Sequence, residues 1–115
     1  MPSRVHGRIQ PEIAVWIKGK CDEEHGGVFA ETPAKAAAGT EFVMLCVCND
    51  NDLRSVVFGD KGILAGIDKG AIVVDHTTAS AIVAREINEA AKAKGVGFVD
   101  GPVSGGQAGA ENGVL

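Results

Sequence analysis

The chain has 115 residues, of which 45% are apolar, and a formal net charge of −4 at pH 7. This length suits one small domain with a single core, so we expect residues 1–115 to form one domain. The eleven Lys and Arg residues are scattered rather than clustered, which argues against nucleic acid and an anionic membrane surface as partners. A small-molecule partner is the expected class.

The cysteines and the apolar runs indicate a compartment. No apolar run reaches the length of a membrane span, and no secretory apolar stretch follows Met1. The odd number of cysteines, at positions 21, 46 and 48, suits a reducing compartment, so we expect a cytoplasmic protein. Cys46 and Cys48 share one face of a predicted strand and are expected to be buried, and the histidines show no ligand spacing, so no metal site is predicted.

Helical and extended patterns alternate from the start of the chain, which is typical of a parallel α/β sheet. Apolar residues at helical spacing, with Pro11 in the first turn, predict a helix from Gln10 to His25. The run from Ile13 to Ile17 also fits a buried strand, and that alternative stays open. A short strand is predicted at Val28 to Ala30.

The next elements are a helix, a strand and a second short helix. Ala34 to Ala38 is predicted to be helical, because Thr32 can cap the helix and Pro33 suits its first turn. Phe42 to Val47 is a strand without polar alternation, which indicates that both of its faces are covered in the middle of a sheet. A polar turn then leads into a helix at Leu53 to Phe58.

The second half of the chain repeats the alternation. Gly59 to Gly70 is expected to be a connecting turn, and Ala71 to Val74 a strand. Ser80 can cap a helix over Ala81 to Lys94, whose apolar stripe is the clearest in the chain. The last strand begins at Gly97 to Val99 and leads into a Pro-Val-Ser-Gly-Gly turn, at the sheet edge where open α/β folds bind ligands.

Several motifs carry a family resemblance. Asp100 to Gly106 has the sequence Asp-Gly-Pro-Val-Ser-Gly-Gly, followed by a Gly-Ala pair. It resembles the substrate loop of the β-hydroxyacid dehydrogenases, the family of 3-hydroxyisobutyrate dehydrogenase and tartronate semialdehyde reductase, in which alanine is usual at the place of Gly101. Further segments are similar to the family's nucleotide-binding domain in order and spacing, namely residues 7–9, 32–39, 47–50, 66–70 and 74–78.

The resemblance implies residues that contact the cofactor, NADP or NAD. Arg8 matches a basic residue that approaches the adenosine ribose and can pair with a 2′-phosphate, which favours NADP. A solvated surface arginine is the alternative. Val47 and Cys48 match the loop that lies along the cofactor, and Thr78 matches a hydroxyl near the nicotinamide ribose. Thr78 can equally serve as a helix-cap residue.

The resemblance also implies a site for a small carboxylate substrate. Ser104, Gly105 and Gly106 correspond to the segment in which a hydroxyl and two N–H groups converge on the carboxylate. By itself, Ser-Gly-Gly also fits a plain turn. His76 is the titratable group nearest the expected edge, and a loop histidine is its usual role.

Two parts of the family pattern are not found in this sequence. The family begins with a strand, a Gly-x-Gly-x-x-Gly turn and a helix that hold the pyrophosphate, and its catalytic lysine lies in a later helical domain. We therefore expect an incomplete Rossmann-like parallel sheet with flanking helices that lacks the first β-α unit, and we predict no catalytic residue. Without a central strand, Phe42 to Val47 would have a free edge, so we expect a homodimer, rearrangement of Val28 to Ala30 into the gap, or poor solubility.

Two functions of different classes follow from these observations. In the first, the chain is a fragment of the NAD(P)-binding domain of a 3-hydroxyisobutyrate dehydrogenase-like oxidoreductase, which transfers hydride between NAD(P) and a small 3-hydroxy acid, and it is inactive alone and binds dinucleotide weakly. In the second, it is a free-standing α/β module for oligomerisation or small-anion binding. Whether the chain is an enzyme stays open, because activity would need a partner chain that supplies the phosphate loop and the lysine.

Overall fold

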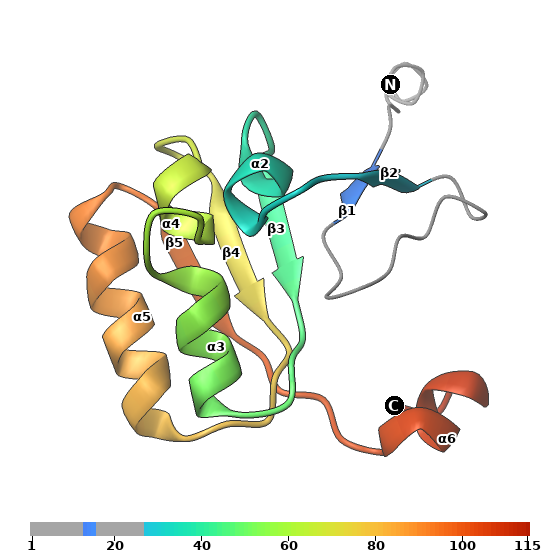
Figure 1. The fold of residues 1–115 in the computed structure, drawn as a ribbon. Coiled ribbons are helices and arrows are strands. Elements are labelled where there is room, and N and C mark those ends of the chain that lie inside the picture. The colour runs from blue at the N-terminus through green and yellow to red at the C-terminus, as the bar shows by residue number, and fades with distance from the viewer. Residues whose placement is uncertain (1–12, 16–26) are drawn as a thin grey trace, which may run out of the picture.

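The computed structural model describes residues 13–15 and 27–115 of the chain. Strands and helices alternate in this part, as the sequence predicts (Figure 1). In chain order the elements are β1 (Ile13–Val15), β2 (Gly27–Phe29), α2 (Pro33–Ala37), β3 (Phe42–Leu45), α3 (Asp50–Val57), α4 (Ile63–Gly66), β4 (Ile72–Asp75), α5 (Ala81–Ala93), β5 (Gly97–Asp100) and α6 (Gly106–Glu111).

The strands form two parallel groups. β3, β4 and β5 make a three-stranded sheet in that order, and β1 pairs only with β2 among the described residues. In the larger sheet Phe42 pairs with Ile72, and Ile72 with Gly97. Parallel neighbours need crossover connections, which helices supply here. The predicted class, an open parallel α/β sheet with flanking helices, is confirmed.

Local capping signals set the starts of three helices. Thr32 Oγ1 accepts from the Lys35 N–H at 3.1 Å at the start of α2. The Asn49 side chain caps α3 in the same way. At the start of α5, Ser80 Oγ accepts from the Val83 N–H at 3.2 Å. Each cap satisfies a backbone N–H that has no partner inside its helix. The helices α2 and α5 begin within one residue of the predicted positions, whereas α3 begins at Asp50, three residues before the predicted Leu53, because Asn49 is its cap.

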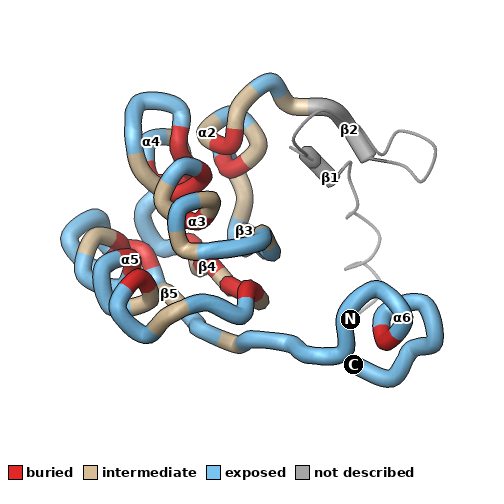
Figure 2. Tube along the Cα trace, turned by 60° about the horizontal axis from the view of Figure 1, so that its bottom comes forward, coloured by how far each residue is buried: buried red, intermediate tan, exposed pale blue. Residues whose placement is uncertain are grey.

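The core lies on one face of the larger sheet. Val43 pairs with Val73 and Leu45 with Asp75, so these four side chains share one face of the sheet. The helices α3 and α5 cover this face (Figure 1), and Leu45 and Val73 are buried there. Figure 2 shows buried residues along α3, α4, α5 and β4, with a separate buried position in α6. The helices contribute the buried apolar side chains Leu53, Val56, Val57, Val83, Ile87 and Ala91.

The expectation that both faces of β3 are covered is wrong. Among the described residues β3 is an edge strand, and Phe42 and Met44 are 54% and 63% exposed. Their partners Ile72 and Val74 are half-buried on the same face. The physical reason is that the helices pack on the opposite face, so a continuous apolar run here marks an open apolar face. Nor does the predicted strand at 28–30 fill the place beside β3, because β2 pairs with β1.

The predicted helix from 10 to 25 is wrong at its centre. Ile13–Val15 is strand β1, which runs parallel to β2 with Ile13 opposite Gly27. Two β-branched residues in a short apolar run suit an extended segment, and sheet pairing decides the ambiguity that periodicity leaves. The alternative strand is thus confirmed over 13–15, while residues 10–12 and 16–25 lie outside the described residues.

Two further helices differ from the prediction. The segment expected to be a connecting turn, 59–70, contains the helix α4. The Pro-Val-Ser-Gly-Gly turn is followed by α6, which the sequence reasoning missed. Gln107 and Glu111 lie one helical turn apart and their side chains hydrogen-bond at 2.7 Å. That i, i+4 pair is the sequence signal that could have indicated the helix.

Two isoleucines of α5 provide a test of the one-sided core. Ile87 is fully buried, whereas Ile82 is 64% exposed. We expect Ile87→Ala to lower the free energy of unfolding by about 3 kcal/mol, because it removes buried surface and leaves a cavity. Ile82→Ala is expected to cost less than about 0.5 kcal/mol. Urea unfolding followed by circular dichroism measures both, and equal losses would contradict this packing.

Candidate functional site

The candidate site lies at the carboxyl ends of β3, β4 and β5. Because these strands are parallel, the segments 46–49, 76–80 and 101–105 all leave the sheet at one edge (Figure 1). The predicted ligand-contacting residues within the described part of the chain are Val47, Cys48, Thr78, Ser104, Gly105 and Gly106. All but Gly106 belong to these segments, and Gly106 begins α6 directly after them. Arg8, the predicted 2′-phosphate partner, lies outside the described residues.

Buried side chains tie the loop after β3 to the loop after β4. Thr77 Oγ1 accepts a hydrogen bond from the Val47 N–H at 2.9 Å. The N–H of Thr77 in turn donates to Asp75 Oδ1 at 2.9 Å. Both Asp75 and Thr77 are 1% exposed. The backbone N–H of Val47 is therefore used within the protein, and its half-buried side chain packs against the core.

The loop after β4 is tied to the loop after β5 by three hydrogen bonds. The Thr78 hydroxyl donates to the Val103 carbonyl oxygen at 3.0 Å, and the Val103 N–H donates to the His76 carbonyl oxygen at 3.2 Å. His76 Nδ1 lies 2.8 Å from the Gly101 carbonyl oxygen. Since a carbonyl oxygen only accepts, we assign a proton to Nδ1, which donates in this contact.

The Ser-Gly-Gly segment is exposed and has backbone angles that favour glycine. Gly105 has φ +125° and Gly106 has φ +62°. A Cβ at Gly105 would also come within 2.9 Å of Leu115 Cδ2. Ser104 precedes this turn, with its side chain exposed. The segment thus presents one exposed hydroxyl beside two glycines that carry no side chain of their own.

Two polar contacts connect α3 with α5 and its capping residue, close to the loops of the candidate site. The Ser80 hydroxyl donates to the Asp50 carboxylate, and the Ser80 N–H donates to it at 2.9 Å. These hydrogen bonds lower the pKa of Asp50. Arg54 Nη2 lies 2.8 Å from Glu86 Oε1, and this contact lowers the pKa of Glu86. Sequence reasoning missed both pairs, because their members lie 30 and 32 residues apart.

The exposed thiols correct a further expectation. Cys46 and Cys48 are free and exposed, so the prediction that they are buried is wrong. They follow β3, the edge strand whose even-numbered residues lie on the uncovered face. Within residues 13–15 and 27–115, no three His, Cys, Asp or Glu side chains are placed together as metal ligands. In the same part of the chain, no helix is long and apolar enough to cross a membrane.

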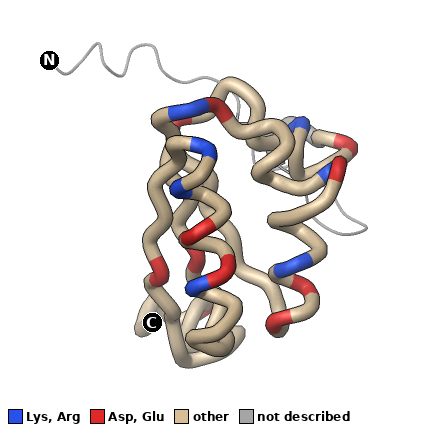
Figure 3. Tube along the Cα trace, turned by 90° about the vertical axis from the view of Figure 1, so that its left-hand side faces the viewer, with Lys and Arg blue, Asp and Glu red and all other residues tan. Residues whose placement is uncertain are grey.

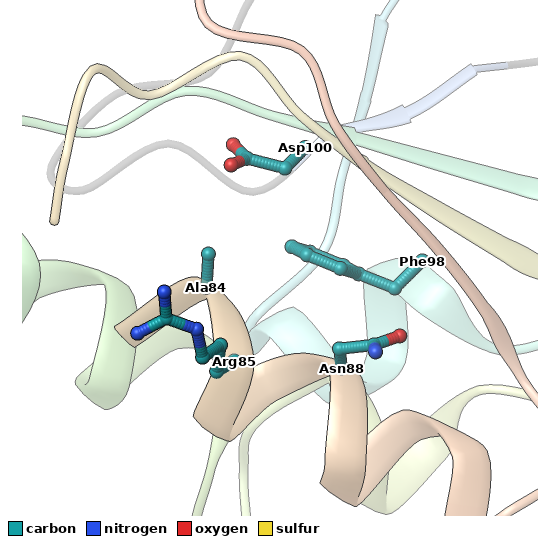
Figure 4. Close-up of a pocket in the computed structure, with 5 residues that line it drawn as sticks. All are labelled: Ala84, Arg85, Asn88, Phe98 and Asp100. Atoms are coloured by element: carbon teal, nitrogen blue, oxygen red, sulfur yellow. The ribbon is translucent and has the colours of Figure 1, made fainter. Parts of the chain in front are cut away.

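An open hollow lies between α5 and β5, and Asp100 at the end of β5 is one of the residues that line it. Figure 4 shows the side chains around it, with Arg85 and Asn88 coming from the helix and Phe98 and Asp100 from the strand. None of the predicted ligand-contacting residues lines it. Charges of both signs are interspersed over the described helices, as Figure 3 shows, which agrees with their scattered distribution in the sequence.

The Asp50 and Ser80 contact leads to a pH-dependent prediction. Ser80→Ala removes the cap of α5, which costs about 1 kcal/mol at any pH, and also the donor that lowers the pKa of Asp50. A carboxylate with a lowered folded-state pKa stabilises the fold above its unfolded pKa and loses that contribution as pH falls through the folded pKa. The stability gap between wild type and Ser80→Ala should therefore shrink as pH falls from about 5 towards 3.

Urea unfolding at a series of pH values measures this gap. Ser55→Ala is the matched control, because the Ser55 hydroxyl donates to the backbone oxygen of Asp52 rather than to a carboxylate. Its stability loss should be constant with pH. A gap for Ser80→Ala that stays constant down to pH 3 would contradict the assigned contact with Asp50.

Comparison with known proteins places the chain in a family. Residues 13–115 match the family described as the NAD binding domain of 6-phosphogluconate dehydrogenase. An uncharacterized oxidoreductase of Shewanella frigidimarina is 51% identical over 111 residues, which are 96% of this chain and 36% of the relative. The chain thus spans about a third of the length of such relatives.

Solved structures agree with this assignment. Mycobacterium tuberculosis 3-hydroxyisobutyrate dehydrogenase with L-serine matches with a TM-score of 0.69 and 27% identity, over 78% of this chain and 30% of that one. The protein Psf3 in complex with NADP+ and 2-OPP matches with a TM-score of 0.70 and 27% identity, over 79% of this chain and 32% of that one. The chain therefore belongs to the family of the NAD binding domain of 6-phosphogluconate dehydrogenase, and its predicted similarity to 3-hydroxyisobutyrate dehydrogenases is confirmed.

Proposed function

We propose that this chain provides part of the dinucleotide-binding unit of a 3-hydroxyisobutyrate dehydrogenase-like oxidoreductase, which transfers hydride between NAD(P) and a small 3-hydroxy acid. One observation carries the proposal. The loops after β3, β4 and β5 are joined by hydrogen bonds at the carboxyl edge of a parallel sheet, which is where open α/β folds bind ligands. The family match and the complex of Psf3 with NADP+ support the choice of ligand.

The residues at this edge fit a dinucleotide. Cys48 and Thr78 are exposed, and the Thr78 hydroxyl oxygen can still accept a hydrogen bond while it donates to Val103. Cys48 would lie along the cofactor beside Val47, and Thr78 would bind the nicotinamide ribose. When bound, the nicotinamide supplies the hydride acceptor or donor. Arg8 is proposed to pair with a 2′-phosphate, which favours NADP over NAD.

Ser104, Gly105 and Gly106 are proposed to hold the substrate carboxylate. Their exposure and the positive φ angles of the two glycines support this assignment, since bare N–H groups and a hydroxyl can converge on an anion. We assign no catalytic residue among the described residues. A reducing compartment such as the cytoplasm is proposed as the location, which suits the two free, exposed thiols Cys46 and Cys48.

A second copy of the chain is the proposed protein partner. The carbonyl oxygens of Glu41 and Leu45 accept hydrogen bonds from the N–H groups of Ile72, in β4, and His76, just after it. The alternating backbone groups of Phe42 and Met44 therefore point to the outer edge of β3. An edge with unpaired groups is a template for another strand, and here its side chains are apolar and exposed. Two β3 strands related by a twofold axis would pair through this edge.

Titration of the chain with NADPH and NADH, followed by amide chemical shifts, tests the dinucleotide site. We expect a dissociation constant of about 1 mM or above, with shifts concentrated at residues 46–49 and 76–78. Arg8→Ala should weaken NADPH binding more than NADH binding, because NADH lacks the 2′-phosphate. Shifts located elsewhere would contradict the site, and equal losses for the two ligands would contradict the role of Arg8.

Light scattering over about 1 μM to about 1 mM protein tests the dimer. We expect the wild-type mass to double with concentration, and Met44→Lys to remain monomeric because a lysine on the edge strand opposes pairing. Val114→Lys is the matched control, since Val114 is an exposed apolar residue near the end of the chain, after α6. A wild-type chain that stays monomeric over the whole range would contradict strand pairing.

A further inference from the structure

Asp75 and Thr77 stand out because they are polar and buried. Within residues 30–115, Asp75 and Thr77 alone have polar or charged side chains that are buried, and each is 1% exposed. Burial of a polar group costs free energy unless the group is hydrogen-bonded. Both side chains accept a hydrogen bond from a backbone N–H, so their polar atoms connect backbone segments inside the protein. Their presence therefore calls for a role in positioning the backbone.

The contacts of the two side chains form a short chain that ends in the loop after β3. Asp75 Oδ1 accepts from the Thr77 N–H at 2.9 Å, which fixes the backbone at Thr77. Thr77 Oγ1 then accepts from the Val47 N–H at 2.9 Å, across 30 residues of sequence. The Val47 side chain packs against the core on its other side. The peptide between Cys46 and Val47 is thus held by a hydrogen bond, and the Val47 side chain by apolar packing.

From this arrangement we propose that Thr77 is a positioning residue, which sets the conformation of residues 46–49 through its hydrogen bond to Val47 and thereby the surface that the dinucleotide meets. The second half of this statement rests on the proposed function. Thr77 itself cannot touch the ligand, because it is buried beneath the loop. Its neighbour Thr78 is exposed and plays a different part. The proposal separates the two adjacent threonines into one that orients and one that binds.

The first experiment measures the loop without any ligand. Thr77→Val keeps the shape of the side chain and loses the hydroxyl. In this variant the hydrogen-exchange rate of the Val47 amide should be about tenfold higher than in wild type, after correction for any change in global unfolding. Thr77→Ser restores the acceptor and should return exchange to within about threefold of wild type. Thr40→Val is the matched control, since the Thr40 hydroxyl donates to Ala37 at 2.8 Å at the far end of the sheet. It should leave Val47 unchanged.

Wild-type exchange of Val47 in Thr77→Val, or failure of serine to rescue it, would overturn the proposal. If Thr77→Val does not fold, the wild-type protein decides the matter. The Val47 amide must then be protected at least about tenfold more than the exposed Cys48 amide, for which no hydrogen bond is recorded within the described residues. Equal protection of these two amides would equally overturn it.

The second experiment asks whether loop position matters for the ligand. NADPH is titrated into wild type, Thr77→Val and Thr77→Ser, with the amide shifts of residues 46–49 as readout. The valine variant should bind at least about threefold more weakly and the serine variant as wild type. If wild type binds at another site, the proposed function fails while the exchange result still decides the positioning role. If all three bind equally at this edge, the function stands and the effect of Thr77 on the ligand is wrong.

Discussion

The parallel pairing of β3, β4 and β5 is the constraint on which the candidate site depends. It sends three successive connections out of one edge, so residues about 30 positions apart along the chain become neighbours there. Strand pairing alone would leave those connections separate beyond the last ladder bond. Side-chain contacts to backbone continue the register past the strands, through Thr77 to Val47 and through Thr78 to Val103. The edge is therefore one connected surface rather than three independent loops.

The two faces of this sheet have opposite physical states. On one face, α3 and α5 bury Leu45, Val73 and the apolar stripes of both helices. On the other, Phe42 and Met44 keep more than half of their surface exposed. The contact that joins the loops after β3 and β4 is anchored on the covered face, where Asp75 and Thr77 are buried. The position of the loop after β3 thus depends on the packed face of the sheet.

Local signals predicted most of the fold, and long-range contacts account for what the sequence could not give. The capping roles of Thr32 and Ser80 are confirmed because a cap depends on neighbours three residues away. The helix from 10 to 25 is wrong at 13–15, where pairing with β2 overrides an ambiguous period. The prediction that both faces of β3 are covered is also wrong. An apolar sequence indicates that a strand can be buried, but it does not indicate that a helix packs on each face.

In the candidate site, too, some features could be predicted from local sequence and others could not. Glycine at 105 and 106 is a local requirement of backbone angle, so a bare turn after β5 could be foreseen from composition. Nothing local indicated that Thr77 rather than Thr78 would be buried, because both follow the same strand and have the same side chain. Strand alternation decides it: Val73, Asp75 and Thr77 share the face that the helices cover, and Thr78 turns outward. A one-residue shift in the pairing register of β4 would bury Thr78 and expose Thr77. The arrangement of the candidate site therefore depends on the register of β4.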